Sequence, residues 1–213
     1  MMKIAVLVSG NGSNLQALID AQQGKQLSGQ IIGVLSNKAD AYALQRAENA
    51  NIATAVISHK DFPNRESFDE AMHQQLLNWQ VDLVILAGFM RILTPNFVSK
   101  WQGKMLNIHP SLLPFYKGVN THQRVLNTGD RLHGCTVHFV TAELDAGQSI
   151  AQSVIEVGLH DTAESLAQRI HKLEHFIYPQ VTQWICNGQL SWKNGKAYFN
   201  QKPLERPIQF AQL

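Results

Sequence analysis

The sequence predicts an α/β protein with a Rossmann-like three-layer α/β/α arrangement, whose mostly parallel central sheet turns mixed toward the C-terminal half. Two observations carry this prediction. In the first half, short continuously apolar runs alternate with segments of helical periodicity, as expected of parallel strands covered on both faces. From His133 onward, apolar residues occupy every second position instead, which is typical of a half-buried antiparallel strand.

Successive βα repeats are predicted over the first half of the chain. An apolar strand at 4–8 is followed by a glycine loop and by a helix over 14–20, which Ser13 is expected to cap. The same alternation continues to residue 87. It predicts strands at 31–35, 54–57 and 81–87 and helices at 42–49 and 65–79.

The second half predicts a short helix, three strands, a long helix and a hairpin. Thr94 caps a helix that has Pro95 at its first position and runs toward Trp101. Asn194-Gly195 is typical of a tight hairpin turn. Strands are expected at 105–108, 133–140 and about 150–157. Asp161 with Glu164 resembles a capping box at the start of a long helix, and Pro179 should kink that helix.

Composition narrows the class of protein. The 213 residues are enough for one ordinary domain, and 18 basic side chains against 16 acidic ones give a net charge of +2, which does not favour nucleic acid binding. The opening apolar run reaches Gly10 too soon to form a signal region or a membrane span. A cytoplasmic protein without membrane contact is therefore expected.

The loop Ser9–Asn14 is the first candidate binding site. It lies between a parallel strand and a helix, where backbone amides and the helix dipole favour an anion. Leu15 replaces the third glycine of the dinucleotide fingerprint, and no Gly-Lys-Ser/Thr follows as in a P-loop. A site for a single phosphate and an ordinary tight turn remain about equally good interpretations.

Asn107 and His109 form the second candidate. If they end a strand, their spacing of two places both side chains on one face, at the edge where α/β proteins bind ligands. Both can donate to an oxygen that becomes negative in a tetrahedral transition state. Asp145 could reach His109 and favour its protonated form. The plainer interpretations are a histidine bonded to a backbone carbonyl and an aspartate that makes a turn.

Metal and nucleophilic chemistry find no support in the sequence. The nine histidines include no zinc-binding spacing, and His171 with His175 lacks the glutamate of a His-Glu-x-x-His motif. No Gly-x-Ser-x-Gly turn is present, and Cys135 lies within a predicted strand. We therefore expect no metal and a direct transfer reaction.

Four segments together resemble the folate-dependent phosphoribosylglycinamide formyltransferases (GAR transformylases). Their order and spacing match the family over nearly the whole chain, up to Tyr178-Pro179. The segments are SGNGSNLQA at 9–17, LAGFMRIL at 86–93, NIHPSLLP at 107–114, and HGCTVHFV at 133–140 followed by Glu143-Leu144-Asp145.

The resemblance implies transfer of a formyl group from 10-formyltetrahydrofolate, as co-substrate, to the amine of phosphoribosylglycinamide in purine synthesis. The partners would be these small molecules, and the protein would be a monomer or homodimer. The resemblance implies catalytic roles for His109, Asn107 and Asp145, substrate binding by Gly12, Ser13, Asn14, His171 and Glu174, and folate binding by Arg65, Met90, Arg91, Ile92, Leu93, Asn107, Thr141, Ala142, Glu143, Leu144 and Asp145.

With these roles, residues 1–213 are expected to form a single formyltransferase domain. Residues 1–101 would be a phosphate-binding half, 102–187 a catalytic and folate-binding half, and 188–213 a C-terminal hairpin and tail. No internal repeat or long linker separates these parts.

Three positions depart from the family pattern. His171 stands where an amide or a lysine is more frequent, and Ala146 replaces a glycine. Asn120 lies in the 115–120 segment where histidine is common, and it removes a titratable group from what the resemblance implies is a mobile loop. Ordering of this loop is therefore predicted to be less sensitive to pH.

Two other functions stay open as alternatives. A formyltetrahydrofolate deformylase shares the Asn107, His109 and Asp145 trio, but it normally carries a preceding regulatory domain. It transfers the formyl group to water, so no phosphate-bearing acceptor would bind at the loop 9–14. A non-catalytic sensor of phosphate ligands would need only that loop. Retention of the trio disfavours the sensor.

Overall fold

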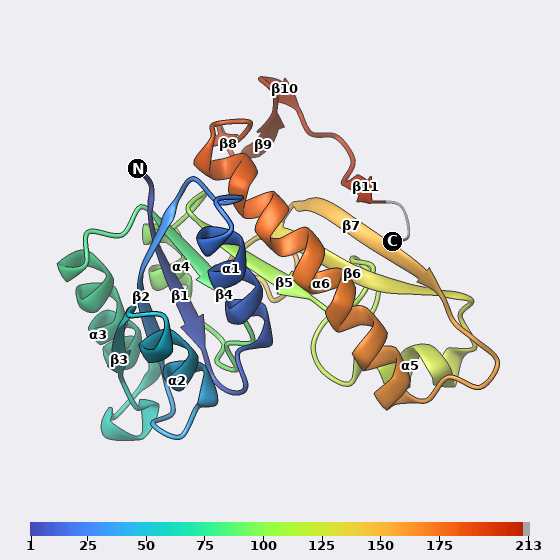
Figure 1. The fold of residues 1–213 in the computed structure, drawn as a ribbon, viewed down its shortest axis with the longest axis horizontal. Coiled ribbons are helices and arrows are strands. Elements are labelled where there is room, and N and C mark those ends of the chain that lie inside the picture. The colour runs from blue at the N-terminus through green and yellow to red at the C-terminus, as the bar shows by residue number, and fades with distance from the viewer. Residues whose placement is uncertain (211–213) are drawn as a thin grey trace.

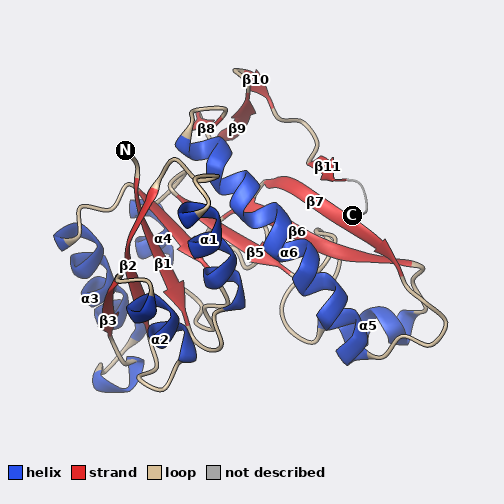
Figure 2. Cartoon of the chain, viewed as in Figure 1, coloured by secondary structure: helices blue, strands red, loops and turns tan. Residues whose placement is uncertain are grey.

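The computed structural model describes residues 1–210, and it confirms a three-layer α/β/α arrangement (Figures 1 and 2). An eight-stranded sheet has the order β11-β7-β6-β5-β4-β1-β2-β3. Its strands are β1 Lys3–Val8, β2 Gln30–Ser36, β3 Ala53–Val56, β4 Leu83–Leu86, β5 Met105–His109, β6 Leu132–Phe139, β7 Ser149–Glu156 and β11 Ile208–Phe210.

Helices cover both faces of this sheet. On one face, α1, α2 and α6 share an apolar core with the strands, and α3 and α4 cover the opposite face. The helices are α1 Ser13–Gln23, α2 Tyr42–Asn49, α3 Arg65–Asn78, α4 Pro95–Lys100, α5 Thr121–Thr128 and α6 Ala163–Cys186, with a short 3₁₀ turn η1 at His59–Asp61.

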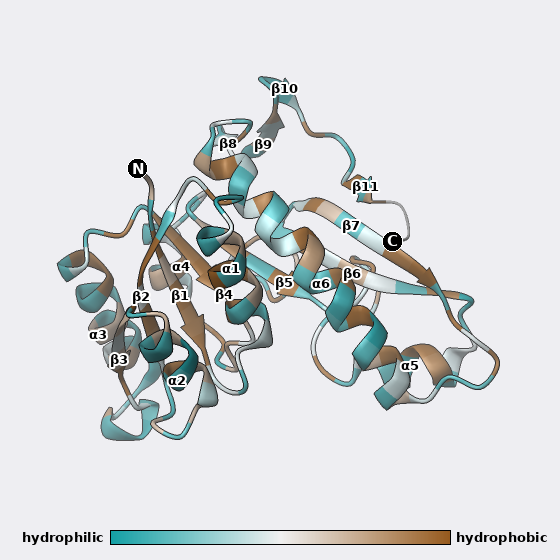
Figure 3. Cartoon of the chain, in the orientation of Figure 1, coloured by the Kyte–Doolittle hydropathy of each residue, from teal (hydrophilic) through white to brown (hydrophobic). Residues whose placement is uncertain are grey.

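The sheet is parallel from β3 to β5 and becomes mixed at β6, as the sequence predicts. β6 pairs antiparallel with β5 and with β7, and β11 then adds to β7 in parallel. Strand β1 is buried from Ile4 to Val8, and Figure 3 shows its apolar character. Its position between β2 and β4 makes it the centre of the parallel half.

Strand β6 is not half-buried, contrary to the alternation in its sequence. All residues from His133 to Phe139 are buried. Helix α6 packs on one face, and the segment after β5 covers the other: the Thr136 hydroxyl donates to the Ser111 carbonyl at 2.7 Å, and the Gln152 amide donates to the Leu113 carbonyl at 2.9 Å. Polar side chains facing this segment are thus bonded rather than solvated.

Two predicted helix caps are wrong. The N-cap of α1 is Gly12, without a side-chain cap, because the glycine loop enters the helix one residue before Ser13 can take that position. Helix α6 begins one residue later than expected, so Thr162 and Ser165 form the capping box in place of Asp161 and Glu164.

The remaining local predictions agree closely with the structure. Helix α4 has Thr94 as its N-cap, with the hydroxyl accepting from the Phe97 amide. Helix α6 continues without interruption through the buried Pro179, and the kink expected there stays a prediction. The hairpin at Asn194-Gly195 joins β8 Leu190–Lys193 to β9 Lys196–Phe199, which form a small antiparallel sheet with β10 Lys202–Pro203. No helix within residues 1–210 is long and apolar enough to span a bilayer.

Candidate functional site

The candidate residues converge at the carboxyl ends of the parallel strands. β1 ends at Val8, β4 at Leu86 and β5 at His109, and these three strands are neighbours in the sheet. The chain order reverses between β1 and β4, and ligands of open α/β sheets bind at such a reversal. Loops that follow β1, β4 and β5 therefore form one continuous edge.

The glycine loop after β1 has the geometry of an anion cradle. Gly12 has φ +76°, and a Cβ atom there would lie 2.5 Å from the Ala43 Cβ, so the loop packs directly on α2. The Ala43 amide donates to the Gly10 carbonyl at 3.1 Å. The first amides of α1, beginning at Ser13 and Asn14, lack helical acceptors, and no side chain caps them.

Arg46 fixes this loop from α2. Its Nε donates to the Asn11 carbonyl at 2.9 Å and its terminal nitrogens donate to the Asn11 and Gln16 side-chain oxygens at 3.1 Å each. The guanidinium also lies over the Tyr42 ring, 4.8 Å from its centroid. A fixed positive charge therefore lies against the glycine loop, a contact that no sequence motif indicates.

Asn14 and Glu174 meet at the other side of the loop. The Asn14 amide donates to a Glu174 carboxylate oxygen at 2.8 Å, which joins α1 to α6. Glu174 is 4% exposed, and burial raises its pKa to about 7. The structure therefore brings together these two expected substrate-binding residues.

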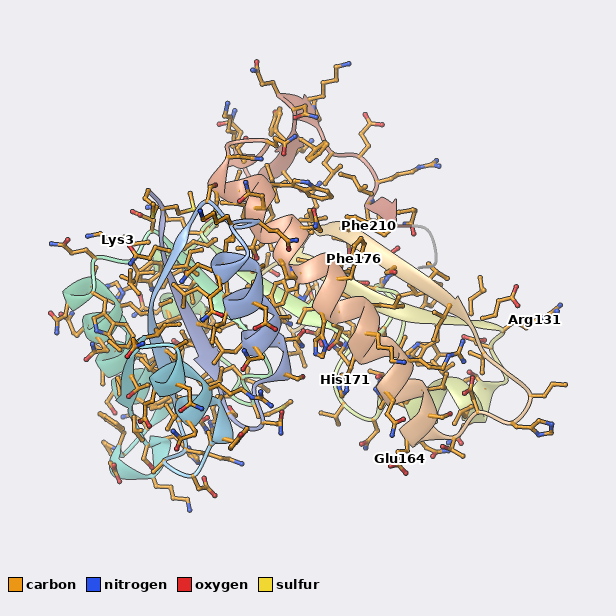
Figure 4. All side chains as sticks on the ribbon, in the orientation of Figure 1. Lys3, Arg131, Glu164, His171, Phe176 and Phe210 are labelled. Atoms are coloured by element: carbon orange, nitrogen blue, oxygen red, sulfur yellow. The ribbon has the colours of Figure 1, made fainter. Side chains whose placement is uncertain are left out.

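His171 lies one turn before Glu174, on the exposed side of α6 (Figure 4). Its ring is parallel to that of His175, with 6.2 Å between the centroids. Burial lowers the pKa of His175, and the positive charge of a protonated His171 adds to that effect. His171 thus has a neighbouring histidine, but within residues 1–210 it makes no direct bond to the glycine loop 9–14.

His109 and Asp145 are in direct contact across the site. The His109 Nδ1 lies 3.4 Å from an Asp145 carboxylate oxygen, and both side chains are buried. The other ring nitrogen, Nε2, donates to the Tyr116 carbonyl at 2.9 Å. Because both nitrogens face oxygen atoms that only accept, the doubly protonated ring satisfies both contacts. Asp145 also accepts from the Gly118 amide at 2.8 Å.

Asn107 is oriented by His138, for which the sequence predicted no role of its own. The His138 Nδ1 donates to the Phe139 carbonyl at 2.9 Å, which leaves Nε2 to accept from the Asn107 amide at 3.1 Å. Burial lowers the pKa of His138 to about 4, so the ring stays neutral. One of the two Asn107 N–H groups is therefore occupied, and the other is available to a ligand.

The segment Met90–Leu93 after β4 is the expected folate-binding segment. Met90 and Ile92 are exposed, with 69% and 57% of their surfaces accessible, whereas Leu93 is buried in the core beside α3 and α4. The segment is held at both ends: the Met90 amide donates to the Ser9 hydroxyl at 2.8 Å, and the Thr94 amide donates to Asp69 at 2.6 Å.

The other expected folate-binding residues lie at the start of α3 and on the turn after β6. Arg65 is exposed at the start of α3, one turn from Asp69. Burial raises the pKa of Asp69, and the Thr94 hydrogen bonds and the Arg65 charge oppose that rise in part. The turn after β6 includes the intermediate Thr141 and the exposed residues Ala142, Glu143 and Leu144, and ends at the buried Asp145, which has φ +48°. Within residues 1–210, no group of three or more His, Cys, Asp or Glu side chains is arranged to hold a metal ion.

Comparison with known proteins identifies a matching family. The family model described as formyl transferase matches residues 2–182. Phosphoribosylglycinamide formyltransferases of Haemophilus influenzae and Escherichia coli are each 46% identical to the chain, over 97% and 95% of its length and 97% and 96% of their own. The human trifunctional purine biosynthetic protein adenosine-3 is 50% identical over 91% of the chain, which spans only 19% of that protein.

Solved structures agree with these matches. The phosphoribosylglycinamide formyltransferase of Coxiella burnetii, determined in complex with CHES, superposes with a TM-score of 0.94 at 47% identity over 98% of the chain and 99% of its own. Glycinamide ribonucleotide transformylase 1 of Symbiobacterium toebii gives a TM-score of 0.90 at 39% identity, over 93% of the chain and 94% of its own.

Proposed function

The chain belongs to the formyl transferase family, and we propose that it transfers the formyl group of 10-formyltetrahydrofolate to the amine of phosphoribosylglycinamide. The products are formylglycinamide ribonucleotide and tetrahydrofolate. The observation that carries this proposal is the contact of His109 with Asp145 beside Asn107, at the sheet edge that also holds the phosphate loop.

The two substrates occupy different parts of this edge. The amides of Gly12, Ser13 and Asn14 bind the ribose phosphate, with Glu174 and His171 near the glycinamide end. The folate lies against Met90–Leu93 and the turn 141–145, with Arg65 at the rim. A flat ring with a polar edge suits the exposed Met90 and Ile92 on either side of Arg91.

The reaction is a direct attack of the amine on the formyl carbon. A new C–N bond forms, and the formyl oxygen becomes negative in the tetrahedral intermediate. His109 and the free N–H of Asn107 donate to that oxygen, and the Asp145 carboxylate lies against the other nitrogen of the His109 ring. The amine loses a proton, the bond from carbon to folate N10 breaks, and N10 takes up a proton as tetrahydrofolate leaves.

His109 must first exchange one hydrogen-bond partner. In the structure its Nε2 donates to the Tyr116 carbonyl, which occupies the direction that a formyl oxygen needs. The Gly118 amide is bonded to Asp145 in the same way. The Tyr116 carbonyl therefore has to move away from His109 when the substrates bind, and the Gly118 bond to Asp145 can remain.

The test compares transfer, hydrolysis and binding in one set of variants. Purified wild-type protein should form formylglycinamide ribonucleotide and should not hydrolyse the formyl donor alone. His109→Ala and Asp145→Ala should each lower kcat by at least about 100-fold and leave the affinity for phosphoribosylglycinamide within a few fold. Formyl-donor hydrolysis without acceptor would instead indicate a deformylase, and binding without turnover would indicate a sensor.

A further inference from the structure

Ser9 connects the two proposed substrate sites through buried hydrogen bonds. It follows β1 and begins the phosphate loop, and only 4% of its surface is exposed. Its hydroxyl accepts from the Met90 amide at 2.8 Å and donates to the Asn37 side-chain oxygen at 2.6 Å. One side chain therefore joins the start of the phosphate loop to the start of the folate-binding segment.

The direction of these bonds is fixed. The Met90 amide can only donate, so the Ser9 oxygen accepts and its proton must point to Asn37. Asn37 is 2% exposed, and its amide nitrogen lies 3.4 Å from the His59 Nδ1. With the His59 proton on Nε2, Nδ1 accepts from this amide and the Asn37 oxygen faces Ser9. The hydroxyl has no other orientation that satisfies both neighbours.

Sheet topology explains why these residues meet. β1 lies between β2 and β4, so the residues that follow these strands are adjacent at the carboxyl edge. The β1 to β4 ladder ends where the Ala87 amide donates to the Leu7 carbonyl at 2.9 Å, and the chain then turns through Gly88 with φ +71°. The Ser9 hydroxyl gives the Met90 amide a partner after the ladder has ended.

We propose that Ser9 is a positioning residue that couples the two substrate sites, so that a ligand in the phosphate loop increases the affinity of the folate site. This inference rests on the proposed function. A phosphate bound by the loop restrains the backbone that carries Ser9. Met90 is then restrained as well, because its amide is bonded to the Ser9 hydroxyl. The other end of the folate-binding segment is already held by the bond from the Thr94 amide to Asp69.

The coupling is reciprocal, since each ligand must change the affinity of the other by the same factor. We expect tetrahydrofolate to bind wild-type protein about fivefold more tightly when phosphoribosylglycinamide is saturating. These two compounds lack a formyl group to transfer, so both can be titrated together without reaction. Isothermal titration of each compound, alone and with the other, measures the factor from both sides.

Ser9→Ala removes the hydroxyl that accepts from the Met90 amide. The factor by which one compound changes the affinity of the other should then fall to about one, while each compound still binds alone. Ser9→Cys, a similar volume with a much weaker acceptor, should behave in the same way and provides a second variant if Ser9→Ala folds poorly. The matched control is Ser36→Ala, at the end of β2, which removes bonds only to the Lys38 backbone and should keep the wild-type factor.

Amide hydrogen exchange gives a readout independent of binding. The Met90 amide should exchange faster in Ser9→Ala than in wild-type protein, and at the wild-type rate in Ser36→Ala. An unchanged coupling factor in Ser9→Ala, or a wild-type factor of one, would overturn the inference while leaving the proposed function intact. Wild-type protein that binds neither compound would overturn both.

Discussion

Asn107 and His138 lie opposite each other on the antiparallel strands β5 and β6, and their side chains meet at 3.1 Å. This pairing places a neutral, buried imidazole where it fixes the orientation of the proposed amide donor. β5 pairs in parallel with β4 and antiparallel with β6. The antiparallel pairing with β6 is what places His138 directly opposite Asn107.

Replacing His138 should therefore lower turnover more than binding. His138→Leu removes the acceptor for Asn107, and we expect kcat to fall about 10- to 100-fold, with KM for both substrates nearly unchanged. His138→Gln, which retains an acceptor, should recover part of the loss. Steady-state kinetics of both variants is the measurement, and a KM increase at wild-type kcat would contradict an orienting role for His138.

Gly12 and Gly10 form a matched pair for testing the phosphate loop. Gly12→Ala places a Cβ against Ala43 in a backbone conformation with positive φ, whereas a Cβ at Gly10 meets nothing within 4 Å. We expect Gly12→Ala to weaken phosphoribosylglycinamide binding at least about tenfold and to destabilise the fold by about 1–3 kcal/mol. Gly10→Ala should change either quantity little. Equal effects of both changes in titration and thermal unfolding would argue against this geometry.

Arg46 should contribute to phosphate binding through its geometry as well as its charge. Arg46→Lys keeps the positive charge but loses the set of guanidinium N–H groups that donate to Asn11 and Gln16. Arg46→Gln loses the charge as well as these hydrogen bonds. We expect the KM for phosphoribosylglycinamide to rise about fivefold in the lysine variant and further in the glutamine variant. If the lysine variant behaves as wild type, the charge alone is sufficient.

His133 should make the fold sensitive to acid. Its ring is 1% exposed and shares a 2.9 Å hydrogen bond with His122, and burial lowers the pKa of His133 to about 4. The unfolded chain takes up this proton at a pH of about 6.5, so the native state binds fewer protons between the two values. Stability therefore falls as the pH decreases from about 6.5 toward 4, by about 1 kcal/mol per unit for this residue.

The contribution of His133 can be isolated by variants, because other groups titrate in the same range. Glu174, whose pKa is raised to about 7, acts in the opposite direction. His133→Asn should lose less stability than wild-type protein between pH 7 and pH 5, by about 2 kcal/mol. The exposed His160→Gln provides the control. Denaturant unfolding at both pH values tests this, and parallel losses in all three proteins would disprove it.

Much of the fold is predictable because it depends on local signals. The bounds of α2 match the predicted 42–49 range, Thr94-Pro95 starts α4 as expected, and Asn194-Gly195 forms the turn of the small hairpin. Each of these features is determined by a cap, a proline or a positive φ within a few residues. The predicted caps of α1 and α6 failed by one residue, where a neighbouring glycine or threonine competed for the same position.

Other features depend on long-range contacts and left no local signal. Helix α5 has a mostly polar sequence and begins after Asn120 in a left-handed conformation. Alternation on β5 predicts that Asn107 and His109 share a face, but the approach of Asp145 depends on the turn between β6 and β7. His138 lies in the HGCTVHFV segment and Arg46 in no motif, but neither sequence context indicates a partner, so only the packing of their elements reveals their contacts.

Strand β11 closes one side of the main sheet. Its residues Ile208–Phe210 pair with Ala151–Ser153 of β7, and Phe210 packs against Phe176 and Trp184 of α6 (Figure 4). An unpaired outer strand is a template on which foreign chains add and aggregate. By pairing with Ala151–Ser153, the three residues of β11 leave the backbone groups of that stretch of β7 no longer open to a strand from another chain, a consequence unrelated to catalysis.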